Sequence, residues 1–92
     1  MKYILFWEFC PSDLDKVIEK SVKRTKMREK NPEKYLKTLF PSHSIGGQCK
    51  GFSVVEATPE QVRDYVLYSL PELQVNFKPL FESAKMIEDY QK

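Results

Sequence analysis

The feature that most constrains this chain is residues 2–9, because the segment is apolar on both faces that a strand would present. Its odd-numbered residues, Tyr3 to Phe9, are aromatic or aliphatic, and Ile4 and Phe6 make the other face apolar as well. Such residues favour a strand, and Pro11 ends the pattern. A strand that is apolar on both faces lies inside a sheet covered on both sides. A chain of 92 residues holds enough helix for one side, so the second side needs another cover.

The next segment predicts a helix that begins near Ser12 and ends before Asn31-Pro32. Serine favours the first position of a helix, and a residue before proline disfavours helical geometry. Apolar and small residues recur at the helical period along one stripe, which we expect to pack on the sheet. The stripe consists of Leu14, Val17, Ile18, Ser21, Val22 and Thr25.

The middle of the chain predicts a hairpin. Residues 38–45 are expected to form an edge strand, since Pro41 lacks the amide that a central strand must donate. Gly46-Gly47 is typical of a tight turn, and residues 48–57 form the returning strand. In that strand Phe52, Val54 and Glu56 share one face, which leaves Gly51, Ser53 and Val55 on the other.

The last third predicts a helix and an edge strand. Thr58, Pro59 and Gln61 match a capping box with proline in the first helical position. Residues 73–80 form the final strand, which contains Pro79 and therefore also lies at an edge. We expect one domain over residues 1–82, followed by a tail over 83–92 that forms a short helix.

The order strand, helix, strand, strand, helix, strand predicts an α+β fold of the ferredoxin-like β-α-β-β-α-β type. Right-handed connections then give a four-stranded antiparallel sheet with both helices on one face. The opposite face is left open, and its apolar residues include Ile4, Phe6, Phe52 and Val54. This exposed patch predicts a homodimer, in which a second copy covers the open face.

The composition excludes several classes of protein. The longest apolar run is far below the ~20 residues that cross a bilayer, and the start lacks a cleavage signal. We therefore expect a cytoplasmic protein with no membrane contact. Cys10 and Cys49 are too few for a disulfide framework, and with His43 they make only a conceivable metal or redox cluster. Idle thiols are favoured, and neither a metal nor another cofactor is expected.

Charge is unevenly distributed along the chain. Residues 20–37 hold eight basic and two acidic residues, a net charge of +6, which leaves −4 for the rest of a chain whose total is +2. Such a segment is typical of a solvated helix face, and the alternative is an anionic partner such as nucleic acid. Nucleic-acid binding is disfavoured, because the basic residues belong to a helix whereas base stacking would use the open sheet face.

Three stretches resemble a small, uncharacterised family of ferredoxin-like proteins: residues 3–11, the hairpin residues 37–43 with 51–57, and residues 73–82. Proteins of this kind are similar to the dimeric α/β-barrel group, in which two open sheets face each other. That group includes cofactor-free monooxygenases of the antibiotic-biosynthesis type and enzymes that resemble muconolactone isomerase. The chain departs from the family in its long basic first helix and at Phe40-Pro41.

The candidate catalytic residues are His43, Glu8 and Glu56. A histidine can act as a general base near neutral pH, and a carboxylate enclosed between two sheets would have a raised pKa and could move protons. The alternative is favoured for all three: a lone histidine is more often a structural or surface residue, and Glu8 and Glu56 lie near strand ends, where carboxylates are usually solvated. No phosphate-binding loop, nucleophile elbow or zinc-protease motif is present. Whether the protein is an enzyme is left open by these residues.

The leading hypothesis is therefore a homodimeric α/β-barrel protein that binds a small apolar molecule between or beside its sheets, with Phe6, Phe52 and Val54 as contacts. The alternatives are a cofactor-free oxygenase or isomerase that uses His43, and nucleic-acid binding through the basic first helix.

Overall fold

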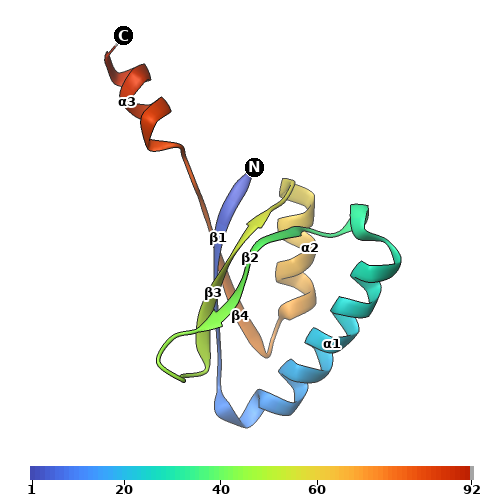
Figure 1. Cartoon of the computed structure of the whole chain (residues 1–92). Coiled ribbons are helices and arrows are strands. Elements are labelled where there is room, and N and C mark those ends of the chain that lie inside the picture. Colours follow the sequence, from blue (N-terminus) through green and yellow to red (C-terminus); the bar gives the residue numbers. More distant parts are fainter. Residues whose placement is uncertain (92) are drawn as a thin grey trace.

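The structure, a computed structural model, describes residues 1–91 and contains one four-stranded antiparallel sheet and three α-helices. The strands are β1 (Lys2–Phe9), β2 (Lys37–Ser44), β3 (Lys50–Glu56) and β4 (Leu73–Pro79). The helices are α1 (Leu14–Lys30), α2 (Pro59–Ser69) and α3 (Ser83–Gln91), as Figure 1 shows. Two short 3-10 helices, Pro11–Asp13 and Pro32–Lys34, flank α1.

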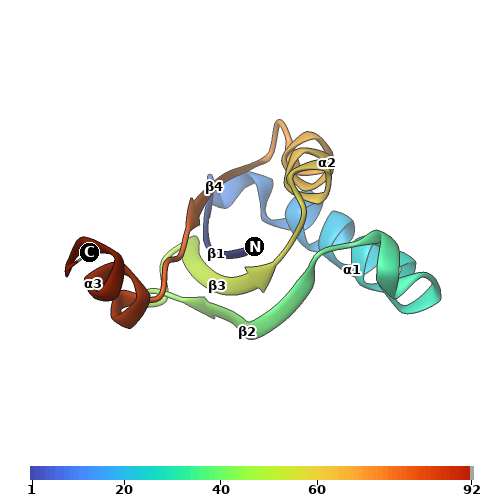
Figure 2. The ribbon, with the colours of Figure 1, turned by 90° about the horizontal axis from the view of Figure 1, so that it is seen from above.

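The strands lie in the order β2-β3-β1-β4, so β1 and β3 are central and the two proline-containing strands are edges. This placement follows from the missing proline amide and confirms the expectation for Pro41 and Pro79. The sheet curves, and α1 and α2 both lie on its concave side (Figure 2). The expected order of strands and helices, the α+β class and the antiparallel pairing of the strands are therefore confirmed.

Register fixes the two faces of the sheet. Ile4 lies opposite Val54, and Phe6 lies opposite Phe52. Because side chains alternate along a strand, these four share the open face, whereas Leu5 and Val55 point toward the helices. The face parity predicted from the sequence is confirmed at each of these positions.

The core is small and lies under α2. It consists of Leu5, Leu36, Val55 and Ala57, with Val62, Tyr65, Val75 and Phe77 packed around it. The ring of Phe77 contacts the edges of Tyr65 and Tyr3, with centroids 5.7 and 5.9 Å away. Edge-to-face rings pack favourably, so this cluster holds α2 against the sheet.

Helix α2 begins as the sequence predicts. The Gln61 amide donates to the Thr58 hydroxyl at 3.2 Å, and the Thr58 amide donates to the Gln61 side chain at 3.0 Å. Pro59 occupies the first turn, where its missing amide costs nothing. The N-terminus of α1 differs, because Ser12 falls inside a 3-10 turn and no side chain caps the helix that begins at Leu14. The expected cap at Ser12 is therefore wrong.

The expected packing of α1 on the sheet is also wrong. Leu14, Ile18 and Val22 are 44%, 51% and 51% exposed, although they belong to the predicted apolar stripe. Helix α1 is instead attached to α2 through long polar side chains on its adjacent face, described below. These side chains hold the helix at a distance from the strands, so its stripe faces a space rather than the sheet.

Helix α3 extends beyond the end of β4, away from the sheet and the other helices (Figure 1). It matches the short helix expected over residues 83–92, within the described range. Its apolar residues Met86, Ile87 and Tyr90 are 57%, 59% and 92% exposed. Helix α3 therefore adds nothing to the core.

Candidate ligand-binding cavity and open sheet face

A cavity of about 490 Å³ lies between α1, α2 and the concave face of the sheet. This volume is within the range of pockets that hold small molecules. Its sheet wall includes Leu5, Trp7 and Val55, and its α1 wall includes Val17 and Ile18. The cavity is thus the space between two apolar surfaces that do not meet.

Lys20 holds one side of this cavity together. Its Nζ donates to the carbonyl oxygens of Tyr68 and Leu70, at 3.1 and 3.0 Å, and lies 2.6 Å from Glu72 Oε2. The hydroxyl of Tyr68 donates back to the Lys20 carbonyl at 2.9 Å. The hydrogen bond from Lys20 lowers the pKa of Glu72 below its ordinary value. A cation on the final carbonyls of α2 also matches the negative end of that helix.

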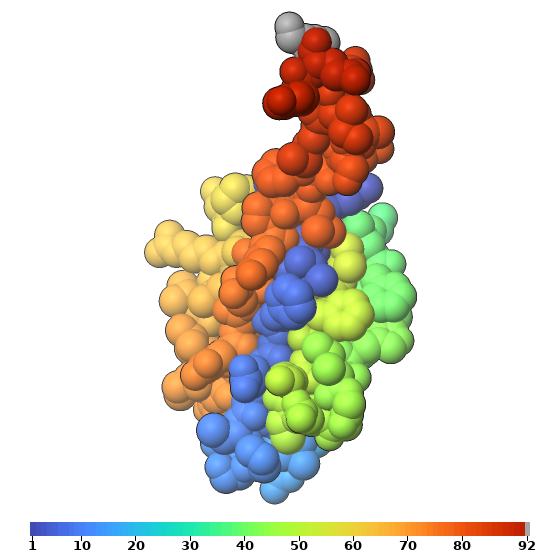
Figure 3. Space-filling model, turned by 90° about the vertical axis from the view of Figure 1, so that its left-hand side faces the viewer, coloured from blue at the N-terminus to red at the C-terminus, as the bar shows by residue number. Residues whose placement is uncertain are grey.

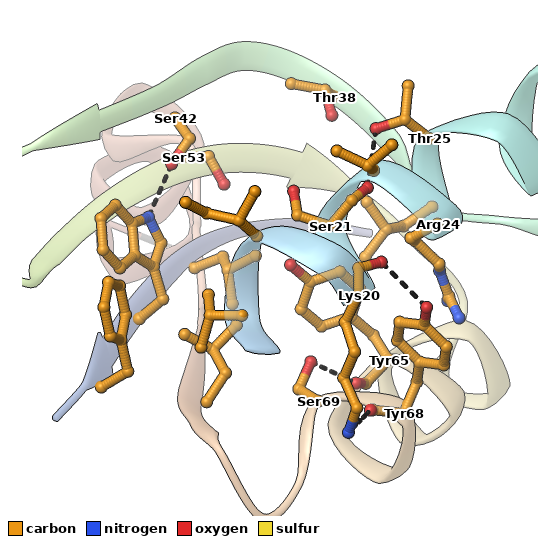
Figure 4. A pocket seen from close by; sticks show the side chains of 18 of the residues that line it. Lys20, Ser21, Arg24, Thr25, Thr38, Ser42, Ser53, Tyr65, Tyr68 and Ser69 are labelled. Atoms are coloured by element: carbon orange, nitrogen blue, oxygen red, sulfur yellow. Dashed lines mark hydrogen bonds between the residues drawn. The ribbon is translucent and has the colours of Figure 1, made fainter. Parts of the chain in front are cut away.

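Arg24 is one turn further along α1 and lies among three tyrosine rings. The guanidinium carbon is 4.5 Å from the ring centroid of Tyr35, 5.5 Å from Tyr65 and 5.0 Å from Tyr68. Cations are attracted to the faces of aromatic rings at such distances. Figure 4 shows Arg24, Tyr65 and Tyr68 together on one side of the cavity, and Ser42 on the other.

Arg28 follows after another turn and donates to the Thr38 hydroxyl on β2 at 3.3 Å. Lys16 pairs with Glu19 and Lys20 with Glu72, and neither Arg24 nor Arg28 forms an ion pair with another residue of the described chain. Both arginines line the cavity. The cavity therefore has two guanidinium groups that no described carboxylate neutralises.

Tyr65 adds a polar group to the same wall. Burial raises the pKa of its hydroxyl, against the opposing effect of Arg24 and then Arg28. The hydroxyl is protonated at neutral pH and is able to donate a hydrogen bond. Ser21, Thr25 and Ser53 also line the cavity. Its chemistry is consequently apolar over most of the wall, with cationic and hydroxyl groups toward α2 and β2.

Sequence reasoning missed this site, although the chain contains a signal for it. Lys20, Arg24 and Arg28 recur every four residues and therefore share one face of a helix, next to the apolar stripe. From the sequence alone, these three residues are interpreted together with the rest of the basic segment as a solvated helix face. Exposed lysines of that segment, such as Lys23 and Lys26, do occupy such a face.

The open face of the sheet is the second candidate site (Figure 3). Phe6, Phe52 and Val54 lie on it as expected, and all three are half-buried. Phe40 and His43 on β2 extend the patch. The ring centroids of Phe40 and His43 are 4.7 Å apart, and that of Phe52 is 5.9 Å from Phe40 and 6.3 Å from His43. The open face therefore carries a cluster of three stacked rings.

The structure brings His43 to this cluster and places the two glutamates far from each other. Glu8 lies opposite Lys50, and Glu56 lies opposite Lys2, so they stand at opposite ends of β1. Six residues of strand place them about 20 Å apart. Both are exposed, and no described side chain encloses either. Both glutamates therefore occupy the solvated positions that the sequence favours, and this chain on its own does not bring them together into an enclosed space.

His43 is held by its own strand. Its Nδ1 lies 2.7 Å from the Pro41 carbonyl oxygen, which only accepts, so Nδ1 carries the proton in this contact. The ring is exposed and acts here as one member of the aromatic cluster.

The cysteines lie near each other at one end of the sheet. The Phe9 amide donates to the Cys49 carbonyl at 3.0 Å, which brings the two strand ends together, yet both thiols are free. Within residues 1–91, no group of three or more potential ligands is placed to hold a metal ion. In the same range, no helix has the length and apolar character to cross a membrane.

Comparison of this chain with protein-family models, with curated proteins and with solved structures finds no match in any of the three. The resemblance to a ferredoxin-like family therefore stays a prediction from the strand sequences. The cavity and the open face are the two features on which a function can be argued.

Proposed function

We propose that this protein binds a small, largely apolar molecule, and that it does so in the cavity between α1 and the sheet. The observation that carries the proposal is the cavity itself, about 490 Å³ in volume and lined by apolar side chains from both α1 and β1. Burial of apolar surface contributes about 25 cal/mol per Å². A ligand that fills this space would bury the stripe of α1 and the concave face of the sheet together.

The proposed site differs from the one expected from the sequence. Phe6, Phe52 and Val54 were expected to contact the ligand, but their side chains lie on the other face of the sheet. In the proposal they form an interface instead. The strand residues that contact the ligand are their neighbours of opposite parity, Leu5, Trp7 and Val55.

The test uses Trp7, which is the single tryptophan of the chain and lines the cavity. We expect the neutral apolar dye N-phenylnaphthylamine to bind, to gain fluorescence and to accept energy from Trp7. Ser21→Phe fills the cavity and should abolish the signal, whereas Lys23→Phe places the same ring on the exposed side of α1. Equal dye binding by the two variants, or none by the unmodified protein, would refute the proposal.

We also propose that the domain is ferredoxin-like and forms a homodimer through its open face, as a dimeric α/β barrel. The strand order β2-β3-β1-β4 and the aromatic cluster on the open face support this arrangement. A symmetric dimer would cover the patch of both copies at once. Light scattering after gel filtration should give twice the chain mass at micromolar concentration, and a clean monomer would remove the proposal.

A second candidate function is the binding of single-stranded nucleic acid on the same face. The observation that favours it is the cluster of stacked rings formed by Phe40, His43 and Phe52, since aromatic rings on an open sheet face can stack on bases. Lys78 lies 6.0 Å from the ring of Phe6 and adds one cation to the face. A gel-shift series with mixed RNA at low salt should show retardation that Phe52→Ala weakens, and no retardation excludes this function.

A further inference from the structure

We infer that the ligand of the cavity is an amphipathic anion, a long-chain carboxylate whose head group binds Arg24 and Arg28 and whose chain lies along the stripe of α1. This inference rests on the proposed function and adds the chemical class of the ligand. It follows from how charge and apolar surface are distributed over the same cavity wall.

The cationic part of the cavity is unusual because its charge is not neutralised from within the described chain. Lys20 is paired with Glu72, but Arg24 faces three aromatic rings and Arg28 contacts a hydroxyl group. A guanidinium presents several donors in one plane, and the contacts of Arg24 with the three tyrosine rings are cation–π contacts rather than hydrogen bonds. These donors remain available to a carboxylate, which Arg binds in a bidentate manner.

Hydroxyl groups surround the same place. The Tyr65 hydroxyl, which lines the cavity, carries its proton at neutral pH as an ordinary tyrosine does and is able to donate to an anion; burial raises its pKa further. Thr38 already accepts a hydrogen bond from Arg28, which leaves its own proton for another acceptor. Together the two arginines and these hydroxyls form a site for a small anionic group. A neutral polar head group would use the hydroxyls but would gain nothing from the charge.

The apolar part of the cavity sets the shape of the rest of the ligand. The stripe of α1 runs from Leu14 to Thr25, and at 1.5 Å per residue it extends about 16 Å along the helix. Trp7 and Phe9 stack at 6.0 Å on the sheet side near its far end, and both line the cavity. An elongated alkyl chain fits between the stripe and these rings. A compact polycyclic molecule would leave either the stripe or the rings uncovered.

The experiment compares dodecanoate with dodecanol, below the concentration at which either aggregates. Both displace N-phenylnaphthylamine if the cavity accepts an alkyl chain, and the carboxylate should bind about tenfold more tightly. Arg24→Gln should reduce that preference to near unity, and Arg28→Gln should reduce it in part. Arg63→Gln, on the exposed surface of α2 and outside the cavity, should leave the preference unchanged.

The outcomes separate this inference from the proposed function. If neither probe binds, the proposed function fails and the inference fails with it. If both bind equally in the unmodified protein, or Arg24→Gln and Arg28→Gln keep the preference, the inference is wrong while the cavity remains a ligand site. Because loss of Arg24 also removes its contacts with the tyrosine rings, circular dichroism of each variant is recorded, and Arg28→Gln decides the matter if Arg24→Gln does not fold.

Discussion

Lys20 Nζ and Glu72 Oε2 lie 2.6 Å apart and join the middle of α1 to the start of β4, 52 residues later in the chain. The side chains of Lys20 and Glu72 are 26% and 17% exposed. This ion pair, with the two carbonyl contacts of the same ammonium group, is a main attachment of α1 to the rest of the domain. It accounts for a helix that is fixed in place without packing its apolar stripe.

The first prediction concerns the pH dependence of this pair. The folded-state pKa of Glu72 is lowered, mainly by the hydrogen bond from Lys20, so the stabilisation is present above the unfolded value of about 4.3. It is lost as the pH falls through the lowered folded value. Glu72→Gln should therefore be less stable than the unmodified protein at neutral pH, and the difference should shrink at about pH 3. Urea denaturation at several pH values measures this.

The matched control for that experiment is Glu19→Gln. Glu19 pairs with Lys16 at 4.0 Å, and both side chains are more than half exposed. Exposed pairs contribute little to stability, so Glu19→Gln should track the unmodified protein at every pH. A Glu72→Gln curve that is parallel to the unmodified one across the acid range would contradict the prediction.

The second prediction concerns the open face. Phe52 stacks near Phe40 and His43 and lies opposite Phe6, at the centre of the proposed interface. Burying a side chain of this kind contributes about 1.5–3 kcal/mol, and a two-fold dimer would bury it in both copies. Phe52→Lys should therefore yield a monomer or a poorly folded chain. Lys26→Glu, on the exposed side of α1, should elute as a dimer, and an undisturbed dimer of Phe52→Lys would disprove the interface.

The third prediction concerns Gly51, which lies opposite Trp7 in the sheet. A methyl group at this position would overlap the Trp7 ring and the carbonyl oxygen of His43. Gly51→Ala should therefore displace Trp7, whose indole donates to Ser42 Oγ at 2.6 Å. Overpacking of this type costs about 1–3 kcal/mol, measurable by thermal or urea unfolding with Trp7 fluorescence as the signal.

Gly46→Asn is the control for Gly51→Ala. Gly46 has a φ of +60° in the hairpin turn, and nothing lies within 4 Å of an added side chain. Asparagine is among the few residues that tolerate this conformation, so the variant should lose little stability. A loss of stability from Gly51→Ala no larger than that from Gly46→Asn would contradict the predicted overlap at Gly51.

The fourth prediction concerns the start of α2. Thr58→Ala removes the acceptor for the Gln61 amide and should cost about 1 kcal/mol. Thr25 provides a comparison. Its hydroxyl donates to the Ser21 carbonyl inside α1, and the helix already pairs that carbonyl with the backbone amide of Thr25. In urea denaturation Thr25→Ala should be close to neutral. A loss of stability from Thr25→Ala equal to that from Thr58→Ala would mean that the capping box of Thr58 and Gln61 contributes nothing specific.

Local signals predicted most of the fold because each depends on residues close in sequence. The capping box of Thr58, the edge positions of Pro41 and Pro79 and the alternation along β1 all follow from backbone chemistry, and all are confirmed. The position of α1 is a different kind of property. It is set by Lys20 reaching Glu72 and by Arg24 meeting three tyrosines, contacts between parts of the chain that no local pattern relates.

The candidate site was predicted incompletely for the same reason. The alternation of side chains along a strand correctly places Phe6, Phe52 and Val54 on one face of the sheet. It gives no information about whether a helix packs directly on the other face. The pairing of Glu8 with Lys50 and of Glu56 with Lys2 depends on register, which fixes their separation. His43 was singled out as the lone histidine, whereas its surroundings, Phe40 and Phe52, became visible only once β2 was placed beside β3.

The alternation along β1 makes this strand intolerant of changes in length. Its odd-numbered residues Leu5, Trp7 and Phe9 line the cavity, and its even-numbered residues Ile4 and Phe6 form part of the open face. Deleting or inserting one residue within Lys2–Phe9 would turn every later side chain to the opposite side. Glu8 would then enter the cavity and Trp7 would leave it. Related sequences should therefore vary in the hairpin turn and beyond β4, and keep the spacing of this first strand constant.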